Sequence, residues 1–301
     1  MTVQMLLTPF LAITLAPLLF GIINRTKAFF AGRQGQLVYQ PYLDLLKLLR
    51  KGAVYSNVTT WIFRASPVVG LAVTICALCI IPLGKAPALI SFKGDLLFVA
   101  YLFGVMRFFT VIAAMDTGSA FEGMGASRET QFSALAEPAL FLALAVVARL
   151  TGTWTLASLT SGLTPELLLG HLPVLLLVIM ALFIVLLAEN SRIPVDDPNT
   201  HLELTMIHEV MVLDHSGVDF GFIMYAAALK LWALAAIISG LILPPASGIL
   251  WYDTVLCLGT MAVVAIAVGI VESTLARLSL LRVPQLLVGA STLALVGLLL
   301  L

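Results

Sequence analysis

The sequence predicts an all-α integral membrane protein, and three observations lead to that prediction. Hydrophobic residues make up 61% of the 301 residues, and charged residues only 11%. The mean hydropathy is +1.09. A soluble domain is about half apolar and about a quarter charged. The apolar residues also fall in long uninterrupted runs, which favours a single membrane domain over residues 1–301. The net charge of zero argues against nucleic acid as a partner.

Eight apolar runs are predicted to cross the membrane, since a spanning helix needs about 20 mostly apolar residues. They cover residues 3–23, 66–83, 96–115, 134–152, 171–188, 221–243, 250–271 and 283–301. No basic segment precedes the first run, which is therefore interpreted as a retained helix and not as a signal peptide. Before the fourth run, Gly118, Gly123 and Gly125 predict an irregular loop.

The lysines and arginines set the predicted orientation. Between the predicted spans, the even-numbered connections contain only Lys85 and Lys93. The odd-numbered connections contain Arg25, Lys27, Arg33, Lys47, Arg50, Lys51, Arg64, Arg128, Arg192, Arg277 and Arg282. Because positive residues stay on the cytoplasmic side, the odd connections are predicted to be cytoplasmic. In a cell inner (plasma) membrane, both termini then lie on the non-cytoplasmic side.

The first connection contains a predicted amphipathic helix. Pro41 suits its first turn. Tyr42, Leu45, Leu46 and Leu49 share one face, with Asp44, Lys47 and Lys51 opposite. This segment is too short and too charged to span, so it is predicted to lie at the lipid headgroups. Packing on a partner subunit is a compatible alternative.

The segment from Glu189 to Gly217 is the one long polar stretch in the C-terminal two-thirds of the chain. Its histidines, His201, His208 and His215, are seven residues apart. On a helix this places neighbours about 10.5 Å apart, too far for one zinc ion with bonds of about 2 Å. No metal site is therefore predicted. Two alternatives remain: histidines buried in a core or an interface, and proton carriers, because histidine titrates near pH 6.5.

Several ionisable residues fall inside the apolar runs, where each costs about 2.5–3.5 kcal/mol at a helix centre. They are Arg107, Glu137, Arg149 and Lys230, with Asp116, Glu189 and Glu272 at the boundaries. One interpretation is a set of structural salt bridges or snorkelling ends, which is favoured for Arg149. For Glu137 and Lys230 a functional role is favoured, since neither is close enough to a predicted end to reach water easily.

No motif in the chain supplies a redox centre. The sequence contains no phosphate-binding loop, no dinucleotide fingerprint, no nucleophile elbow and no four-cysteine set for an iron–sulfur cluster. No catalytic residue is assigned, and this chain is predicted to bind no cofactor itself. Any redox centres would belong to partner subunits.

The polar stretch from Glu189 to Gly217 resembles a segment of a known protein family. A-E-N-S-R-I-P-V-D-D-P from Ala188, then Glu203-Leu204 and Asp214-His215-Ser216-Gly217, is similar to the third cytoplasmic loop of the subunit 1 family of respiratory complex I. Other segments are similar to the branch found in membrane-bound [NiFe] hydrogenases and formate hydrogenlyases. They are Tyr42 to Leu48, Arg107-Phe108-Phe109, Asp116 to Ser119, Gly125 to Glu129, Glu137-Pro138, Leu229-Lys230 and Glu272 to Arg277.

The resemblance implies a membrane anchor that docks a soluble iron–sulfur and hydrogenase arm and passes charge or protons into the membrane. The implied partners are hydrogenase large and small subunits, an iron–sulfur protein, antiporter-like membrane subunits and membrane lipid. The partners would carry the [4Fe-4S] clusters and the NiFe centre. We interpret as charge or proton relay the residues Asp116, Glu137, Glu189, His201, Glu203, His208, Asp214 and Lys230. We interpret as the docking loop Arg128, Arg192, Asp196 and Asp197.

The chain departs from the family pattern in the same stretch. Two of the three glutamates in P-E-A-E-x-E are replaced, by Asn199 and His201, and E-Y-S-G becomes Asp214-His215-Ser216-Gly217. These changes favour a hydrogenase-type complex over a quinone site. The alternatives are a quinone-site subunit of a complex I-like dehydrogenase and a purely structural anchor.

Overall fold

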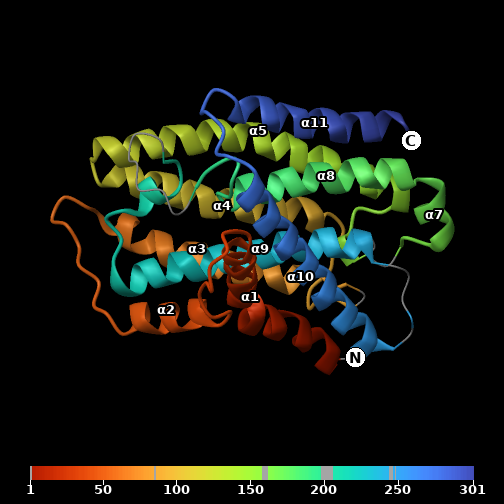
Figure 1. Cartoon of the computed structure of the whole chain (residues 1–301), viewed down its shortest axis with the longest axis horizontal. Helices are drawn as coiled ribbons and strands as arrows, with labels where there is room; N and C mark the ends of the chain where they lie inside the picture. Colours follow the sequence, from red (N-terminus) through yellow and green to blue (C-terminus); the bar gives the residue numbers. More distant parts are fainter. Residues whose placement is uncertain (1, 85, 158–161, 198–205, 244–246, 248) are drawn as a thin grey trace.

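The computed structural model describes residues 2–84, 86–157, 162–197, 206–243, 247 and 249–301. Within these ranges the chain forms a bundle of long helices (Figure 1). The elements are α1 (Thr2–Phe30), α2 (Gln40–Leu49), α3 (Trp61–Ile80), α4 (Asp95–Asp116), α5 (Ala120–Thr151), α7 (Pro165–Gly170), α8 (Leu172–Glu189), the 3-10 helix η1 (Glu209–Val212), α9 (Gly217–Ile242), α10 (Leu250–Thr274) and α11 (Val283–Leu299).

Each of the eight predicted spans coincides with one of these helices, so the all-α membrane fold is confirmed. Seven of the described helices are long and apolar enough to cross a membrane. The eighth, α11, is apolar but has 17 residues. The chain is therefore a multi-pass membrane protein.

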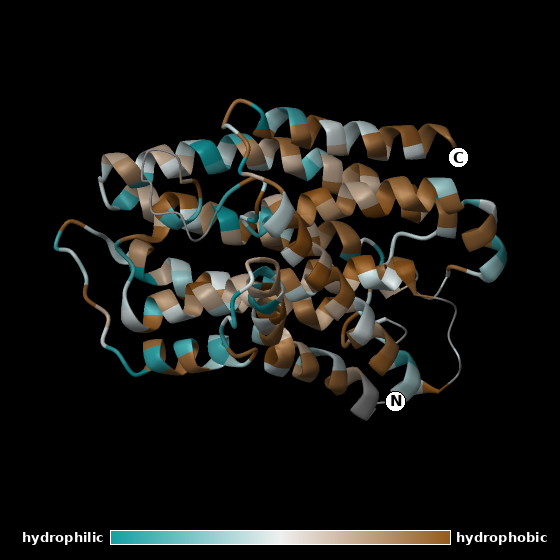
Figure 2. Ribbon diagram, in the orientation of Figure 1, coloured by the Kyte–Doolittle hydropathy of each residue, from teal (hydrophilic) through white to brown (hydrophobic). Residues whose placement is uncertain are grey.

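Helix α9 lies at the centre of the bundle. In its most apolar window 72% of the residues are buried, against 39–44% in the other candidate spans. It packs against α1, α2, α3, α8 and α10. Figure 2 shows hydrophobic residues along most of the bundle, with hydrophilic residues gathered on α2 and at the end of the bundle where α5 begins. The position of Lys230 on α9 thus places a cation in the middle of the apolar core.

The predicted amphipathic helix is confirmed as α2, with Pro41 in its first turn. It lies along the side of the bundle against α1 and α9. A Cβ atom at Gly221 of α9 would lie 3.3 Å from the Cβ of Leu48. The missing side chain at Gly221 therefore lets α2 approach α9 closely.

The start of α5 differs from the prediction. Only Gly118 has a positive φ, of 68°, whereas Gly123 and Gly125 lie inside α5, so the irregular loop predicted there is wrong. The reason is packing. A Cβ at Gly125 would lie 2.3 Å from Val210 Cγ1 and 2.9 Å from the Ile207 carbonyl oxygen. This glycine leaves room for η1 to lie on α5 and does not break the helix.

Helix α1 contains Pro17, which has no N–H to donate to the carbonyl of Ile13. The hydroxyl of Tyr225 on α9 donates to that carbonyl instead, at 2.6 Å. The hydroxyl of Tyr42 on α2 donates to the next carbonyl, that of Thr14, also at 2.6 Å. The proline in α1 thus frees the carbonyl that binds α9, and the next carbonyl binds α2.

We expect Tyr225→Phe to lower the free energy of unfolding by about 1 kcal/mol, because the Ile13 carbonyl loses the hydroxyl donor that replaces the missing N–H. The measurement is the midpoint of thermal unfolding of the purified protein in detergent. Tyr252→Phe, at a half-exposed tyrosine near the start of α10, is the matched control. Equal midpoints for the two variants would contradict this account of α1.

Candidate functional site

A network of buried charges joins four helices in the apolar part of the bundle. We call Arg107, Glu129, Glu137, Glu189 and Lys230 the Arg107 network. The Arg107 guanidinium on α4 contacts Glu129 at 3.4 Å and Glu137 at 2.5 Å, both on α5, and also contacts Glu189 at the end of α8. The second oxygen of Glu189 contacts the Lys230 ammonium on α9 at 2.6 Å. The ion pairs therefore run without a break from α5 to α9.

The burial of these side chains explains why they must be paired. The side chains of Arg107, Glu189 and Lys230 are 9%, 5% and 8% exposed, whereas that of Glu137 is 45% exposed. Removing one partner of a buried ion pair costs about 3–5 kcal/mol, because the other charge stays behind unpaired. The network is thus buried at its centre and exposed to the surroundings at Glu137.

A second group of charges lies where α1 and α10 end. We call Lys27, Arg192 and Glu272 the Glu272 network. The Glu272 carboxylate has a fully buried side chain and contacts Lys27 at 2.8 Å and Arg192 at 3.3 Å. The Arg192 guanidinium also lies 4.6 Å from the centre of the Phe20 ring. This network connects α1 and α10 to the segment that follows α8.

Asp196 organises the segment that follows α8. It is 2% exposed and contacts Arg277 at 2.9 Å. Its carboxylate also accepts hydrogen bonds from the backbone N–H groups of Ile207 and His208, at 3.1 and 3.0 Å. One side chain therefore holds both ends of the segment around residues 198–205.

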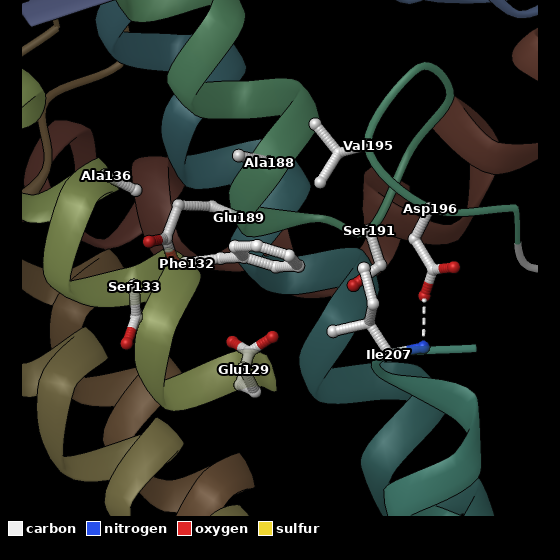
Figure 3. Close-up of a pocket in the computed structure, with 10 residues that line it drawn as sticks. All are labelled: Glu129, Phe132, Ser133, Ala136, Ala188, Glu189, Ser191, Val195, Asp196 and Ile207. Atoms are coloured by element: carbon white, nitrogen blue, oxygen red, sulfur yellow. Dashed lines mark hydrogen bonds between the residues drawn. The ribbon is translucent and has the colours of Figure 1, made fainter. Parts of the chain in front are cut away.

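A small pocket lies between the Arg107 network and Asp196. It is lined by Glu129, Glu189 and Asp196, together with Phe132, Ser133, Ala136, Ala188, Ser191, Val195 and Ile207 (Figure 3). Its volume of about 10 Å³ has room for about one water molecule. The carboxylates around this space can act as the polar partners that a buried water needs.

Two larger cavities are lined by α1, α2 and α9. The inner cavity, of about 250 Å³, has a polar side with Asn24, Arg192 and His208 and an apolar side that includes Phe20 and Phe220. The outer cavity, of about 460 Å³, is almost entirely apolar and is lined by residues including Pro17, Leu45, Leu49, Leu71 and Phe222.

The segment 214–219 fastens the first long connection to the start of α9. The Ser216 hydroxyl accepts the N–H of Val54 at 3.0 Å. Gly217 has φ of 55°, and a Cβ there would lie 2.3 Å from the Gly52 carbonyl oxygen. The Tyr55 hydroxyl is hydrogen-bonded to Asp219, which raises the pKa of that tyrosine. The first half of the connection between α2 and α3 is thus fixed against the start of α9.

His215 lies buried within this segment, with its ring stacked on Phe63 at 3.9 Å between centroids and 6° between planes. Burial lowers the pKa of His215 to about 4. Burial also lowers the pKa of His208, which lines the inner cavity. Both imidazoles are therefore neutral at pH 7, the form that can accept a proton.

The structure brings together only part of the predicted relay. Glu137, Glu189 and Lys230 lie in the Arg107 network. Asp116 instead accepts hydrogen bonds from the N–H and hydroxyl of Thr60, at 2.7 and 3.0 Å, next to the start of α3. The Asp214 side chain is exposed, and its backbone N–H donates to Glu122 at 3.1 Å. Glu203 and His201 lie outside the described residues, so their predicted roles stay predictions.

The predicted docking residues lie around the same segment. Arg192 and Asp196 are buried in the contacts described above, and Asp197 is half-buried. The Arg128 guanidinium donates to the Met206 carbonyl oxygen at 2.8 Å. These contacts hold the segment in place within this chain, which is compatible with a docking role for its outer surface.

Four residues that are central to these networks were not assigned a role from the sequence: Lys27, Arg107, Glu129 and Glu272. The sequence did contain evidence for two of these residues. Arg107 lies inside an apolar run and Glu272 at the end of one, and charges at membrane depth pair with each other. Glu129 and Lys27 lie outside the predicted spans, where a charged residue gives no such signal.

The comparisons with known proteins agree with this architecture. The profile of the family described as NADH dehydrogenase matches residues 2–301. The chain belongs to this complex I subunit 1-like family. It is 30% identical to formate hydrogenlyase subunit 4 of Escherichia coli (strain K12) over 278 residues, covering 90% of this chain and 89% of that protein.

Two further relatives are similar to this chain at lower sequence identity. Hydrogenase-4 component C of the same organism is 29% identical and covers 87% of this chain and 84% of that protein. An NADH-quinone oxidoreductase subunit of Neisseria meningitidis is 25% identical and covers 66% of this chain and 56% of that protein. Among solved structures, a chain of the membrane-bound sulfane sulfur reductase, an archaeal respiratory membrane complex, is similar with a TM-score of 0.83 and 25% identity. That match covers 99% of this chain and 98% of the other. The chain is therefore related to membrane subunits of respiratory complexes.

We expect His215→Tyr to make folding stability less dependent on acid pH. The pKa of His215 is about 4 in the folded protein, against 6.5 for an unperturbed histidine. Between these values the unfolded state binds more protons, so the stability of the fold decreases as the pH falls. At pH 5 this histidine accounts for a loss of about 2 kcal/mol. Tyrosine keeps an aromatic ring against Phe63 and does not titrate there.

The measurement is the unfolding midpoint of the purified protein between pH 7.5 and 5. His171→Gln, at a half-exposed histidine beside α7, should keep the wild-type pH dependence. If His215→Tyr lost as much stability as the wild type over this range, His215 would not be the titrating group.

Proposed function

We propose that this protein is a membrane anchor and coupling subunit of a membrane-bound [NiFe] hydrogenase or formate hydrogenlyase complex. It docks a soluble iron–sulfur and hydrogenase arm and relays charge or protons toward antiporter-like membrane subunits. The similarity to formate hydrogenlyase subunit 4 and to hydrogenase-4 component C supports this assignment. In this proposal the partners hold the NiFe centre and the [4Fe-4S] clusters, the odd-numbered connections face the cytoplasm, and the membrane is the cell inner membrane.

The observation that carries the proposal is the Arg107 network itself. Ionisable residues inside a membrane are costly, and they commonly mark ion or proton pathways. Here three carboxylates and two cations form one continuous series of contacts across α5, α4, α8 and α9. Because neighbouring charges are in direct contact, a change in the charge of one group alters the proton affinity of the next.

The proposed direction of the relay follows from position. The segment after α8 lies beside the Glu272 network through Arg192, and in this proposal it is the part of the chain nearest the soluble arm. The pocket beside Glu129, Glu189 and Asp196 leads from this segment to the Arg107 network. Glu137, with the most exposed side chain of the network, forms the opposite end.

Neutralising Glu137 tests the relay. We expect Glu137→Gln to lower ion translocation linked to hydrogen production by about 100-fold, the smallest effect usual for losing a proton-transfer group. The complex should still assemble, because glutamine keeps the shape and Arg107 retains Glu129 and Glu189. Proton uptake into inverted membrane vesicles measures the outcome.

Glu166→Gln, at an exposed carboxylate on α7, is the matched control, and Glu137→Asp should restore part of the activity. If Glu137→Gln translocates ions at the wild-type rate, the relay is wrong and the chain is a structural anchor only.

The second candidate function is that of a quinone-site subunit of a complex I-like dehydrogenase. The inner and outer cavities favour it, because a polar end beside Arg192 and His208 and an apolar volume of about 460 Å³ would suit a headgroup and an apolar tail. The similarity to the NADH-quinone oxidoreductase subunit of Neisseria meningitidis also supports this second function, but it covers less of the chain.

Filling the outer cavity separates the two functions. Leu45→Trp adds bulk to the cavity wall formed by α2. The hydrogenase function predicts hydrogen-linked turnover close to that of the wild type, since no substrate passes through the cavity. Leu43→Trp, at an exposed leucine of α2, controls for the extra bulk. Quinone-linked turnover that is present in the wild type and lost only in Leu45→Trp would favour the second function.

A further inference from the structure

The outer cavity has an apolar interior whose few hydroxyl groups are already hydrogen-bonded within the chain. Its volume is about 460 Å³, and its walls come from α1, α2, α3 and α9. The hydroxyls of Tyr225 and Tyr42 donate to the carbonyls of Ile13 and Thr14, both at 2.6 Å. The Thr14 hydroxyl donates to the Phe10 carbonyl at 2.9 Å. None of these hydroxyls has a proton left for a buried water, which needs several polar partners. The interior therefore suits hydrocarbon.

The outer cavity opens at the surface of the bundle beside α2. Three residues that line it, Leu46, Leu49 and Ile13, are 52%, 45% and 37% exposed. Helix α2 lies along the side of the bundle (Figure 1). An amphipathic helix of this kind is predicted to lie at the boundary between lipid headgroups and acyl chains. In that position, the apolar opening faces the acyl chains of the surrounding lipid.

Three cations lie close to this opening, at the end of α2 and directly after it. Lys47, Arg50 and Lys51 are exposed, and the first two each follow a leucine that lines the cavity. Among the described residues that line the outer cavity, none is charged. The carboxylate of α2, Asp44, lines the inner cavity instead and accepts the Gln40 amide at 3.0 Å. The opening of the outer cavity is thus apolar inside and positive beside α2.

We propose that the outer cavity binds one acyl chain of an anionic phospholipid, and that Lys47, Arg50 and Lys51 bind the phosphate of its headgroup. Each cation near a membrane surface raises the affinity for anionic lipid by about fivefold. A neutral quinone could fill the same volume with its tail, but it would leave the three cations unused. The lipid goes beyond the proposed function, since it requires neither the relay nor the docking of a soluble arm.

The bound chain would complete the packing of α2. Helix α2 approaches α9 where Leu48 meets Gly221, and it reaches α1 through the Tyr42 hydroxyl. Between these two contacts the cavity separates Leu45 and Leu49 from Phe222. Hydrocarbon in this space supplies the dispersion contacts that an empty volume lacks. The lipid is thus a structural component that holds α2 to the bundle.

The experiment is native mass spectrometry of the assembled complex in detergent, with dioleoyl phosphatidylglycerol and dioleoyl phosphatidylcholine added in equal amounts. The two lipids have the same acyl chains, so only the headgroups compete. We expect one tightly retained phosphatidylglycerol per copy of this chain, at about tenfold higher occupancy than phosphatidylcholine. Equal occupancy of the two lipids would overturn the phosphate site. A co-purified quinone that occupies the cavity in place of lipid would overturn the whole proposal and favour the second function.

Filling the cavity identifies which retained lipid belongs to it. Leu45→Trp on α2 and Leu71→Trp on α3 add bulk from two different walls, and each should remove the one tightly retained lipid. Leu43→Trp, at an exposed leucine of α2 outside the cavity, should keep it. The unfolding midpoint shows whether each variant folds, and a variant that does not fold leaves the other as the test. A folded cavity variant that retains the lipid would contradict the assignment.

Neutralising the cations tests the headgroup without changing the cavity. The double variant Lys47→Gln with Arg50→Gln should lower the occupancy ratio of phosphatidylglycerol to phosphatidylcholine by about tenfold, while one lipid stays bound. Lys93→Gln, at an exposed lysine before α4, is the matched control and should keep the wild-type ratio. An unchanged ratio in the double variant would overturn the role of these cations. None of these measurements uses turnover, so their outcome is independent of the relay.

Discussion

The arrangement of the helices depends on the contact of one guanidinium with three carboxylates. Arg107 lies inside an apolar helix, where an unpaired charge would cost several kcal/mol. Its partners, Glu129, Glu137 and Glu189, are 22, 30 and 82 residues away in the sequence. For all three to reach one side chain, α4, α5 and α8 must converge. Lys230 then joins through Glu189, which brings the charged side of α9 to the same place. Van der Waals packing holds these helices together in the membrane, whereas the charges determine which faces meet.

Two glycines and one proline also help to bring the helices together. Gly125 allows η1 to lie on α5, and Gly221 allows α2 to lie on α9. Pro17 removes a hydrogen bond inside α1, and Tyr225 uses the freed carbonyl to bind α1 to α9. In each case a feature that weakens an isolated helix strengthens a contact between helices. This explains how a chain with few charged residues still specifies one packing arrangement.

The helices could be predicted from the sequence because a membrane requires length and apolarity, and both are local properties. The amphipathic α2 was predictable for the same reason, from its period of 3.6. Glu137, Glu189 and Lys230 stood out as charges within or beside apolar runs. The ion pairs between them could not be predicted, because pairing depends on which faces meet in the folded bundle. Gly123 and Gly125 were misinterpreted as loop residues. At Gly125 the glycine serves close packing against η1, whereas nothing lies within 4 Å of a Cβ added at Gly123. Glu129 and Lys27 lie outside the predicted spans, so nothing in their local sequence marked them as members of a buried ion-pair network.

The segment after α8 separates the inner cavity from the small pocket beside the Arg107 network. Ser191 lines both the inner cavity and the small pocket beside the Arg107 network, and its neighbour Arg192 lines the cavity. The segment is therefore the wall between these two spaces. Asp196 and Glu272 hold that wall through Arg277, Arg192 and two backbone N–H groups. A ligand or partner that shifts the wall must disturb these ion pairs, and the disturbance is next to Glu189. In the proposed relay, the inner cavity and the buried charges would therefore be coupled through these few residues.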